Sequence, residues 1–222
     1  MTRRRLAAAC LSLLPVFSAG AAAAAEPPPD DHRRLAAGET VLRMDPPPAV
    51  AGRAAREIAV PADRVARAVG DWRHYAEFFP FVERSAAAVE DGAVVVRQTI
   101  APARLLPRRR LAARVEARHE SGVAGRRVWR FRWHDLAGRP GDGGEWIVRE
   151  LSPGRTRVEL RLSGRLGLPA ALERRALERT LGWALDGLAQ QVHRCRYDLP
   201  RHPTCREAPP FAAPAAGGAA AP

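Results

Sequence analysis

Strict alternation of apolar and charged side chains is the feature of this sequence that most limits its fold. Residues 111–118, 128–134 and 157–162 place apolar side chains at every second position, and residues 94–100 and 146–148 are β-branched or aromatic segments. A period of two is typical of strands with one buried face and one face in water, as in antiparallel sheets. Because short Gly- and Pro-containing turns separate the segments, the sequence predicts a meander of hairpins.

Helical patterns flank these strands on both sides. Residues 51–60 suit an early strand, and Pro61 then opens a helix with apolar side chains at helical spacing over residues 65–72. A second short helix is expected over residues 72–78, and residues 169–195 carry the apolar period of one long helix. These elements bury their apolar faces best in an α+β fold, with a curved antiparallel sheet wrapped around the last helix.

The segment around the two small helices resembles a known family. Residues 58–65 lead into residues 69–72, and a D-x-x-x-Y-x-x-F-x-P pattern follows. The positions on this pattern are Asp71, Tyr75, Phe78 and Pro80. Over residues 50–200, motif and element order resemble the START-like (SRPBCC) proteins, especially the polyketide cyclase and coenzyme Q-binding branch. The resemblance implies a helix-grip fold with two small helices after the first strand, and it carries no universal catalytic residue.

The N-terminus suggests export. Within residues 1–25, three arginines precede a short apolar stretch, and Ala23-Ala24-Ala25 offers a cleavage site for a signal peptidase. A poorly ordered, alanine-rich N-terminus of a cytosolic protein is the alternative interpretation. The further expected parts are a Pro-rich linker at 26–37, a ligand-binding domain at 38–205 and a disordered Ala/Pro/Gly tail at 206–222. We therefore expect a secreted or periplasmic protein.

The charge of the chain is strongly positive and is carried by arginine alone. Basic residues number 36 against 24 acidic ones, for a formal net charge of +12. Several arginines alternate away from the apolar face of the predicted sheet, which should make its outer surface basic. They are Arg114, Arg118, Arg130, Arg132, Arg157 and Arg161. This surface either solvates the protein or contacts an anionic membrane peripherally. Nucleic acid is not expected as a partner, because no motif combines stacking rings with basic residues.

Aromatic and leucine side chains on the predicted inner surfaces are the candidate ligand-binding residues. They are Trp72, Tyr75, Phe79, Trp129, Phe131, Trp133, Trp146, Leu177, Leu181 and Leu188. A concave sheet that does not collapse onto its helix leaves an apolar cavity, whereas the alternative is a dry core filled by these rings. We expect the domain to bind a lipid, an isoprenoid quinone or a polyketide-like molecule, for carriage or sequestration.

Catalytic signals are weak. No Gly-x-Ser-x-Gly elbow, phosphate loop, dinucleotide fingerprint or His-Glu-x-x-His motif occurs in the sequence, so neither a cofactor nor a metal is expected. His74 and Glu77 lie three residues apart on a short predicted helix, where they could act as acid and base in a cyclase/aromatase-type enzyme. The alternative is two solvated side chains, and binding without catalysis is the first hypothesis.

Two cysteines lie near the end of the predicted domain. In an oxidising compartment Cys195 and Cys205 are expected to form a disulfide that pins the C-terminal segment to the last helix. Two free thiols are the alternative. A metal site that adds His193 and His202 is also conceivable by residue type, but its spacing matches no zinc pattern.

Overall fold

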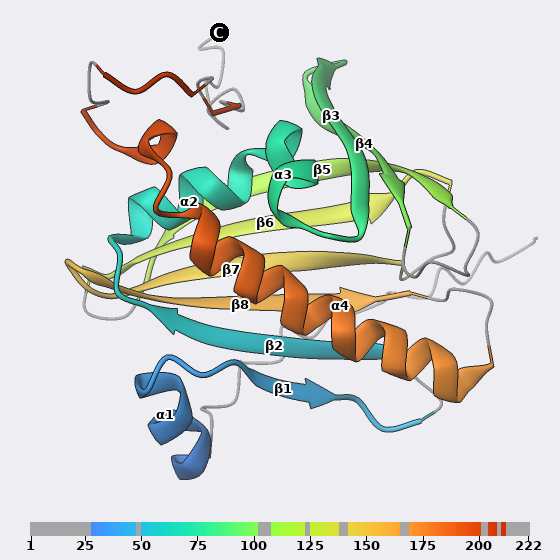
Figure 1. The fold of residues 1–222 in the computed structure, drawn as a ribbon, viewed down its shortest axis with the longest axis horizontal. Helices are drawn as coiled ribbons and strands as arrows, with labels where there is room; N and C mark the ends of the chain where they lie inside the picture. Colours follow the sequence, from blue (N-terminus) through green and yellow to red (C-terminus); the bar gives the residue numbers. More distant parts are fainter. Residues whose placement is uncertain are drawn as a thin grey trace, which may run out of the picture.

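One antiparallel sheet forms the largest part of the computed structural model (Figure 1). The structure describes residues 28–47, 50–101, 108–122, 125–137, 142–164, 169–200, 204–207 and 210–211. Within these residues the sheet has eight strands in the order β1-β2-β8-β7-β6-β5-β4-β3. The strands are β1 (Val41–Met44), β2 (Ala51–Ile58), β3 (Val82–Glu90), β4 (Ala93–Ile100), β5 (Arg109–Ser121), β6 (Arg127–Asp135), β7 (Gly143–Ser152) and β8 (Arg155–Ser163).

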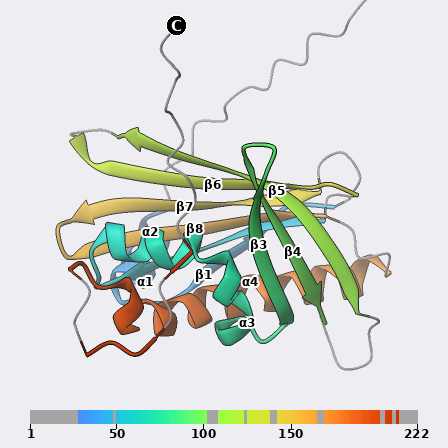
Figure 2. The same cartoon turned by 90° about the horizontal axis from the view of Figure 1, so that it is seen from above.

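The helices lie against this sheet, most of them on its concave face. They are α1 (Pro29–Ala36), α2 (Ala62–Gly70), η1 (Trp72–His74), α3 (Tyr75–Phe78), α4 (Ala170–Gln191) and η3 (Cys195–Tyr197). The long helix α4 crosses the concave face, α2 and α3 lie beside it, and α1 lies near the β1 edge (Figure 1). Figure 2 shows the twist that turns β3 and β4 away from the direction of β7. The predicted α+β helix-grip fold is confirmed.

The cross-strand register sorts the alternating side chains onto two faces. Trp146 on β7 lies opposite Phe131 on β6 and Leu160 on β8, so the three side chains share the concave face. Their neighbours Glu145 and Ile147 lie on the convex face. The core fills the space between the concave face and α4, and its most buried members include Val148, Val158, Leu181, Leu185, Leu188 and Val192.

Two segments differ from the sequence-based expectations. Residues 29–36, expected in a linker, form helix α1. Pro29 suits the first turn of a helix, and the carboxylates of Asp30 and Asp31 interact favourably with the positive end of the helix dipole. Leu35 is buried and so attaches the helix to the rest of the protein. Strand β3 was not predicted, because its alanine-rich sequence lacks the alternation of the other strands and most of its side chains are exposed at the sheet edge.

The C-terminal end of the domain also differs. Helix α4 ends at Gln191 instead of residue 195, because the chain then turns into η3. Glu207 and Phe211, expected in a disordered tail, contact the domain. The predicted signal peptide at residues 1–25 and the end of the tail at 212–222 lie outside the described residues.

Close packing of α4 against α3 depends on a glycine. A Cβ atom at Gly187 would lie 2.2 Å from the carbonyl oxygen of Phe78, whereas a Cβ at Gly182 on the same helix would meet no atom within 4 Å. Because the clash at Gly187 is with backbone, rotation of a side chain cannot relieve it. The distance between the two helices therefore requires glycine at this one position of α4.

We predict opposite effects for alanine at these two glycines. Gly187→Ala should lower the free energy of unfolding by about 1–3 kcal/mol through overpacking. Gly182→Ala should raise it by about 0.5–1 kcal/mol, because alanine has the higher helix propensity. Denaturant unfolding of the two variants checks this, and destabilisation of equal size in both would contradict the proposed close approach.

Candidate ligand-binding cavity

A cavity of about 510 Å³ lies between the concave face of the sheet, the short helices η1 and α3, and the first half of α4. Rings from both layers line it, namely Trp72, Tyr75, Phe79, Phe81, Trp133 and Trp146. Aliphatic side chains complete the apolar wall, among them Val82, Val96, Leu111, Ala113, Val115, Leu160, Leu162 and Leu177. The volume lies within the roughly 300–1,000 Å³ typical of small-molecule sites.

The rings reach the cavity for simple local reasons. Trp72, Tyr75 and Phe79 follow helical spacing, so they project from one side of the short helices, and strand alternation places Trp133 and Trp146 on the concave face. The ring centroids of Trp72 and Tyr75 are 4.7 Å apart, those of Tyr75 and Phe79 are 4.6 Å apart, and those of Trp72 and Trp133 are 5.7 Å apart. This contiguous set of rings forms one wall.

A glycine on β7 makes room for one of these rings. A Cβ atom at Gly144 would lie 2.3 Å from the Trp133 ring and 2.6 Å from the Arg161 carbonyl oxygen. Gly144 faces Trp133 in the β6–β7 register. The missing side chain at Gly144 therefore leaves room for the Trp133 ring over the neighbouring strand at this end of the cavity.

The structure brings six of the ten predicted ligand-binding residues to the cavity wall: Trp72, Tyr75, Phe79, Trp133, Trp146 and Leu177. The other four do not line it. Trp129 packs against the His119 ring and lies under Arg127, and Phe131 lies beside Gly70 of α2. Leu181 and Leu188 are fully buried between α4 and the sheet.

Sequence reasoning missed part of the wall. Phe81, Gln98 and Thr180 line the cavity. Phe81 lies two residues after Phe79 in the sequence, and Gln98 lies two residues after Val96, so the predicted strand over residues 94–100 would put Gln98 on the same face as Val96. Thr180 carried no comparable signal, because it is a polar residue on a helix.

Polar groups within the cavity wall are already bonded to the protein. The Tyr75 hydroxyl donates to the Val69 carbonyl oxygen at 2.6 Å, and the Thr180 hydroxyl donates to the Ala176 carbonyl oxygen at 2.9 Å. Gln98 donates to Ser85 Oγ at 3.1 Å. Among the described residues, every buried side-chain nitrogen or oxygen has a hydrogen-bond partner. The inner wall is therefore apolar in character despite these side chains.

Charged side chains gather at the end of the cavity formed by strand ends and the N-terminal turn of α4. They are Arg109, Arg110, Asp135, Asp142 and Glu173. Arg109 and Arg110 are exposed, whereas Glu173 is buried. The cavity thus combines an apolar interior with a charged rim, a combination suited to an amphipathic molecule.

His74 and Glu77 are not on the cavity wall. His74 Nδ1 lies 2.7 Å from the Asp71 carboxylate, and Glu77 accepts a hydrogen bond of 2.8 Å from Arg196. The two side chains approach each other to 3.8 Å, next to the C-terminal segment. Their partners fix them outside the cavity, where they could not reach a ligand held inside it.

Asp71 connects the small helices to the end of the chain. Its fully buried carboxylate accepts hydrogen bonds from the Tyr197 hydroxyl at 2.9 Å and from the Phe211 backbone N–H at 2.9 Å, besides its contact with His74. A buried carboxylate is stable only with such partners. The family motif residue therefore has a structural role that the sequence did not reveal.

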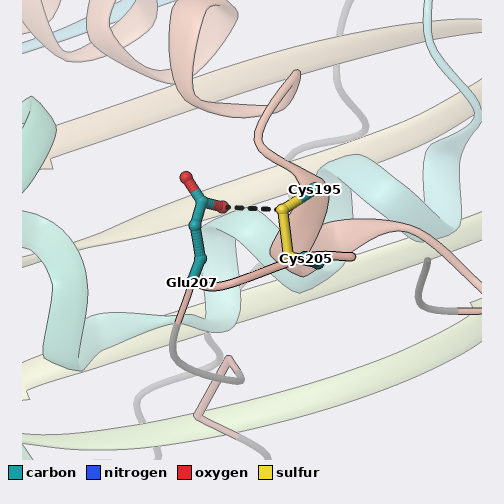
Figure 3. A group of neighbouring side chains, drawn as sticks. All are labelled: Cys195, Cys205 and Glu207. Atoms are coloured by element: carbon teal, nitrogen blue, oxygen red, sulfur yellow. Dashed lines mark hydrogen bonds between the residues drawn. A yellow bond between two sulfur atoms is a disulfide. The ribbon is translucent and has the colours of Figure 1, made fainter. Parts of the chain in front are cut away.

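A disulfide joins Cys195 and Cys205, with Glu207 beside it (Figure 3). The Glu207 carboxylate lies 3.6 Å from the Cys195 sulfur and accepts from the Arg196 backbone N–H at 3.2 Å. A bonded pair of sulfurs has no thiolate to offer a metal, and His202 of the considered metal set lies outside the described residues. In this state the cysteines hold the chain end against η3.

Fold and cavity together define a START-like protein. The sequence matches the polyketide cyclase / dehydrase and lipid transport family over residues 50–193, and the chain belongs to this family. The chain therefore contains a START/polyketide cyclase-like domain. No curated protein matches the chain significantly.

Three solved structures illustrate the similarity. A STAR-related lipid transfer protein from Xanthomonas axonopodis has a TM-score of 0.53 and 15% identity, covering 69% of this chain and 92% of that chain. Human StAR-related lipid transfer protein 5 has a TM-score of 0.51 and 14% identity, with coverages of 73% and 89%. The Zhui aromatase/cyclase from Streptomyces sp. R1128 has a TM-score of 0.50 and 25% identity, with coverages of 65% and 93%. The first two similarities show the fold alone.

Tyr75 and Tyr197 are the only tyrosines in the sequence, which makes their ionisation measurable. Burial is the main cause that raises the pKa of both phenols above the ordinary 10.0. Their neutral forms thus stabilise the folded state below pH 10, and this stabilisation is lost as the pH rises above that value.

We therefore predict little tyrosinate absorbance from the folded protein at pH 10, where the protein unfolded in guanidinium chloride should be about half ionised. The free energy of unfolding should fall above pH 10. A native titration midpoint equal to that of the unfolded chain would contradict the burial of both hydroxyls.

Proposed function

We propose that this protein binds a hydrophobic small molecule in the cavity between the sheet and α4, for carriage or sequestration. The ligand class is a lipid, an isoprenoid quinone or a polyketide-like molecule. The observation that carries the proposal is the apolar wall, where polar groups such as the Tyr75 hydroxyl are bonded within the protein. Removal of apolar ligand surface from water against such a wall favours binding by ~25 cal/mol per Å² of apolar area buried.

The charged rim supports an orientation for the ligand. An apolar body would contact the rings, while a polar end would remain near Arg109, Arg110 and Asp135. The opposite orientation would bury a polar group against a largely apolar wall, which costs several kcal/mol unless the group finds a hydrogen-bond partner there. An amphipathic ligand therefore fits better than a uniformly polar one.

A cyclase/aromatase-type enzyme is the second candidate function. Its support is the 25% identity to the Streptomyces aromatase/cyclase. Because His74 and Glu77 are bonded to Asp71 and Arg196 outside the cavity, acid/base chemistry would fall to rim carboxylates such as Asp142. The internally bonded wall favours carriage over this alternative.

Export is part of the proposal. The leader pattern at residues 1–25 supports passage through a membrane to the periplasm or the exterior. The disulfide between Cys195 and Cys205 is of the kind that persists in oxidising compartments. A quinone role of the type known from intracellular members would then concern a different compartment, so lipid-like ligands come first.

The test of ligand binding is solvent extraction of the purified protein followed by mass spectrometry, and it should release a co-purifying hydrophobic compound. Ala113→Leu, which narrows the cavity, should reduce both this compound and the binding of N-phenyl-1-naphthylamine about tenfold or more, because cores tolerate added volume poorly. Ala112→Leu is the matched control, since Ala112 lies outside the cavity wall.

Equal loss of probe binding in both variants would point to general destabilisation. Unchanged probe binding by the Ala113→Leu variant would show that the ligand does not bind in this cavity. Turnover of a polyketide-like substrate that depends on Asp142 would favour the enzyme.

Processing of the leader gives a separate prediction. Expressed in a host with a secretory pathway, the protein recovered from the periplasm or medium should begin at Glu26. N-terminal sequencing measures this. Recovery of the intact N-terminus from the cytosol alone would contradict export and leave the ligand proposal untouched.

A further inference from the structure

The convex face of the sheet places arginines directly opposite one another on neighbouring strands. The facing pairs are Arg53 with Arg161, Arg149 with Arg157, and Arg118 with Arg130. Like charges in directly opposed positions destabilise a sheet. Three such pairs across β2, β8, β7, β6 and β5 create a broad positive surface that needs counter-charges.

Carboxylates of the protein meet only part of this need. Four of the six facing arginines have a carboxylate partner: Arg157 pairs with Glu57 at 2.8 Å, Arg161 with Glu159 at 2.7 Å, Arg130 with Glu120 at 3.2 Å and Arg118 with Glu116 at 3.5 Å. Within the described residues, however, Arg53 and Arg149 have no salt bridge or side-chain hydrogen bond. Burial lowers the pKa of Arg149, and the neighbouring arginines lower it further against the opposing effect of Glu159.

We propose that this arginine-rich convex face binds the anionic headgroups of a membrane surface. A sheet face offers an extended array of guanidinium groups, which suits many phosphates in a plane better than one small anion. The Ile147 side chain at its centre is fully buried. The contact is therefore peripheral and electrostatic, and no helix among the described residues is long and apolar enough to cross a bilayer.

The placement of the aromatic rings argues against a nucleic acid on this face. Trp129, Phe131 and Trp133 share the concave side of β6, so their alternating neighbours Arg130 and Arg132 face outward without rings between them. Stacking platforms, on which single-stranded nucleic acids rely, are thus turned to the opposite side of the strand.

The arginine face also adjoins the cavity. A hollow lined by three arginines and three carboxylates shares Trp133 and Gly143 with the cavity wall; the charged residues are Arg53, Arg132, Arg161, Asp45, Asp142 and Glu145. A protein docked through this face would hold one end of its cavity close to the lipid surface. This last link rests on the proposed function, whereas the charge argument stands without it.

The test is co-sedimentation of the purified protein with vesicles of phosphatidylcholine, with or without about 30% phosphatidylglycerol. The wild type should bind only the anionic vesicles, and high salt should release it. Because each base contributes about fivefold to such binding, Arg53→Gln with Arg149→Gln should weaken it about 25-fold. The control is Arg175→Gln with Arg179→Gln, which removes the same charge from exposed positions of α4.

Equal weakening in both double variants, or equal binding to neutral vesicles, would overturn the proposal. Binding to soluble polyglutamate as tight as to anionic vesicles would also overturn it, in favour of an acidic protein partner. Should the Arg53/Arg149 variant unfold, Arg114→Gln with Arg118→Gln at exposed positions of the same face replaces it, with the same expected loss. Vesicle binding is measured independently of ligand extraction. A negative result with vesicles would therefore leave the proposed ligand cavity untouched.

Discussion

The concave face of an eight-stranded sheet is wider than the helix that packs against it, and this mismatch decides where the empty space lies. Eight strands at about 4.8 Å spacing span ~34 Å, whereas a helix with its side chains is about 10–12 Å across. Helix α4 packs chiefly on β1, β2 and β8. The strands β4, β5 and β6 are left to face a gap, and the rings of η1 and α3 close it from the other side.

The wall formed by η1 and α3 depends in turn on the end of the chain. Arg64 donates to the Val192 carbonyl oxygen at 2.5 Å, and Arg67 donates to the Tyr197 carbonyl oxygen at 2.6 Å. Together with the contacts of Asp71, these bonds hold α2 and η1 against η3. The cavity is therefore bounded by segments that are more than a hundred residues apart in sequence, and no local pattern could have shown this.

Much of the fold could be predicted from the sequence, because alternation assigns each strand residue to one face of the sheet even when the neighbouring strands are unknown. Trp133 and Trp146 were placed correctly on the concave side for this reason. Phe131 has the same pattern, yet it packs beside Gly70, and Leu181 has the same helical period as Leu177, yet it lies in the core. Whether a concave residue faces a cavity or a neighbour depends on the distance between layers, which close contacts such as that at Gly187 determine.

The bonds of Asp71 have a consequence for how the protein is made. Its partners Tyr197 and Phe211 lie 126 and 140 positions further along the chain, so they leave the ribosome long after the strands. Before these two residues have been synthesised, folding would bury the Asp71 carboxylate without two of its hydrogen bonds, at a cost of a few kcal/mol. A growing chain therefore gains this stabilisation only after Phe211 has left the ribosome, which delays complete folding of the domain until well after its last strand has been made.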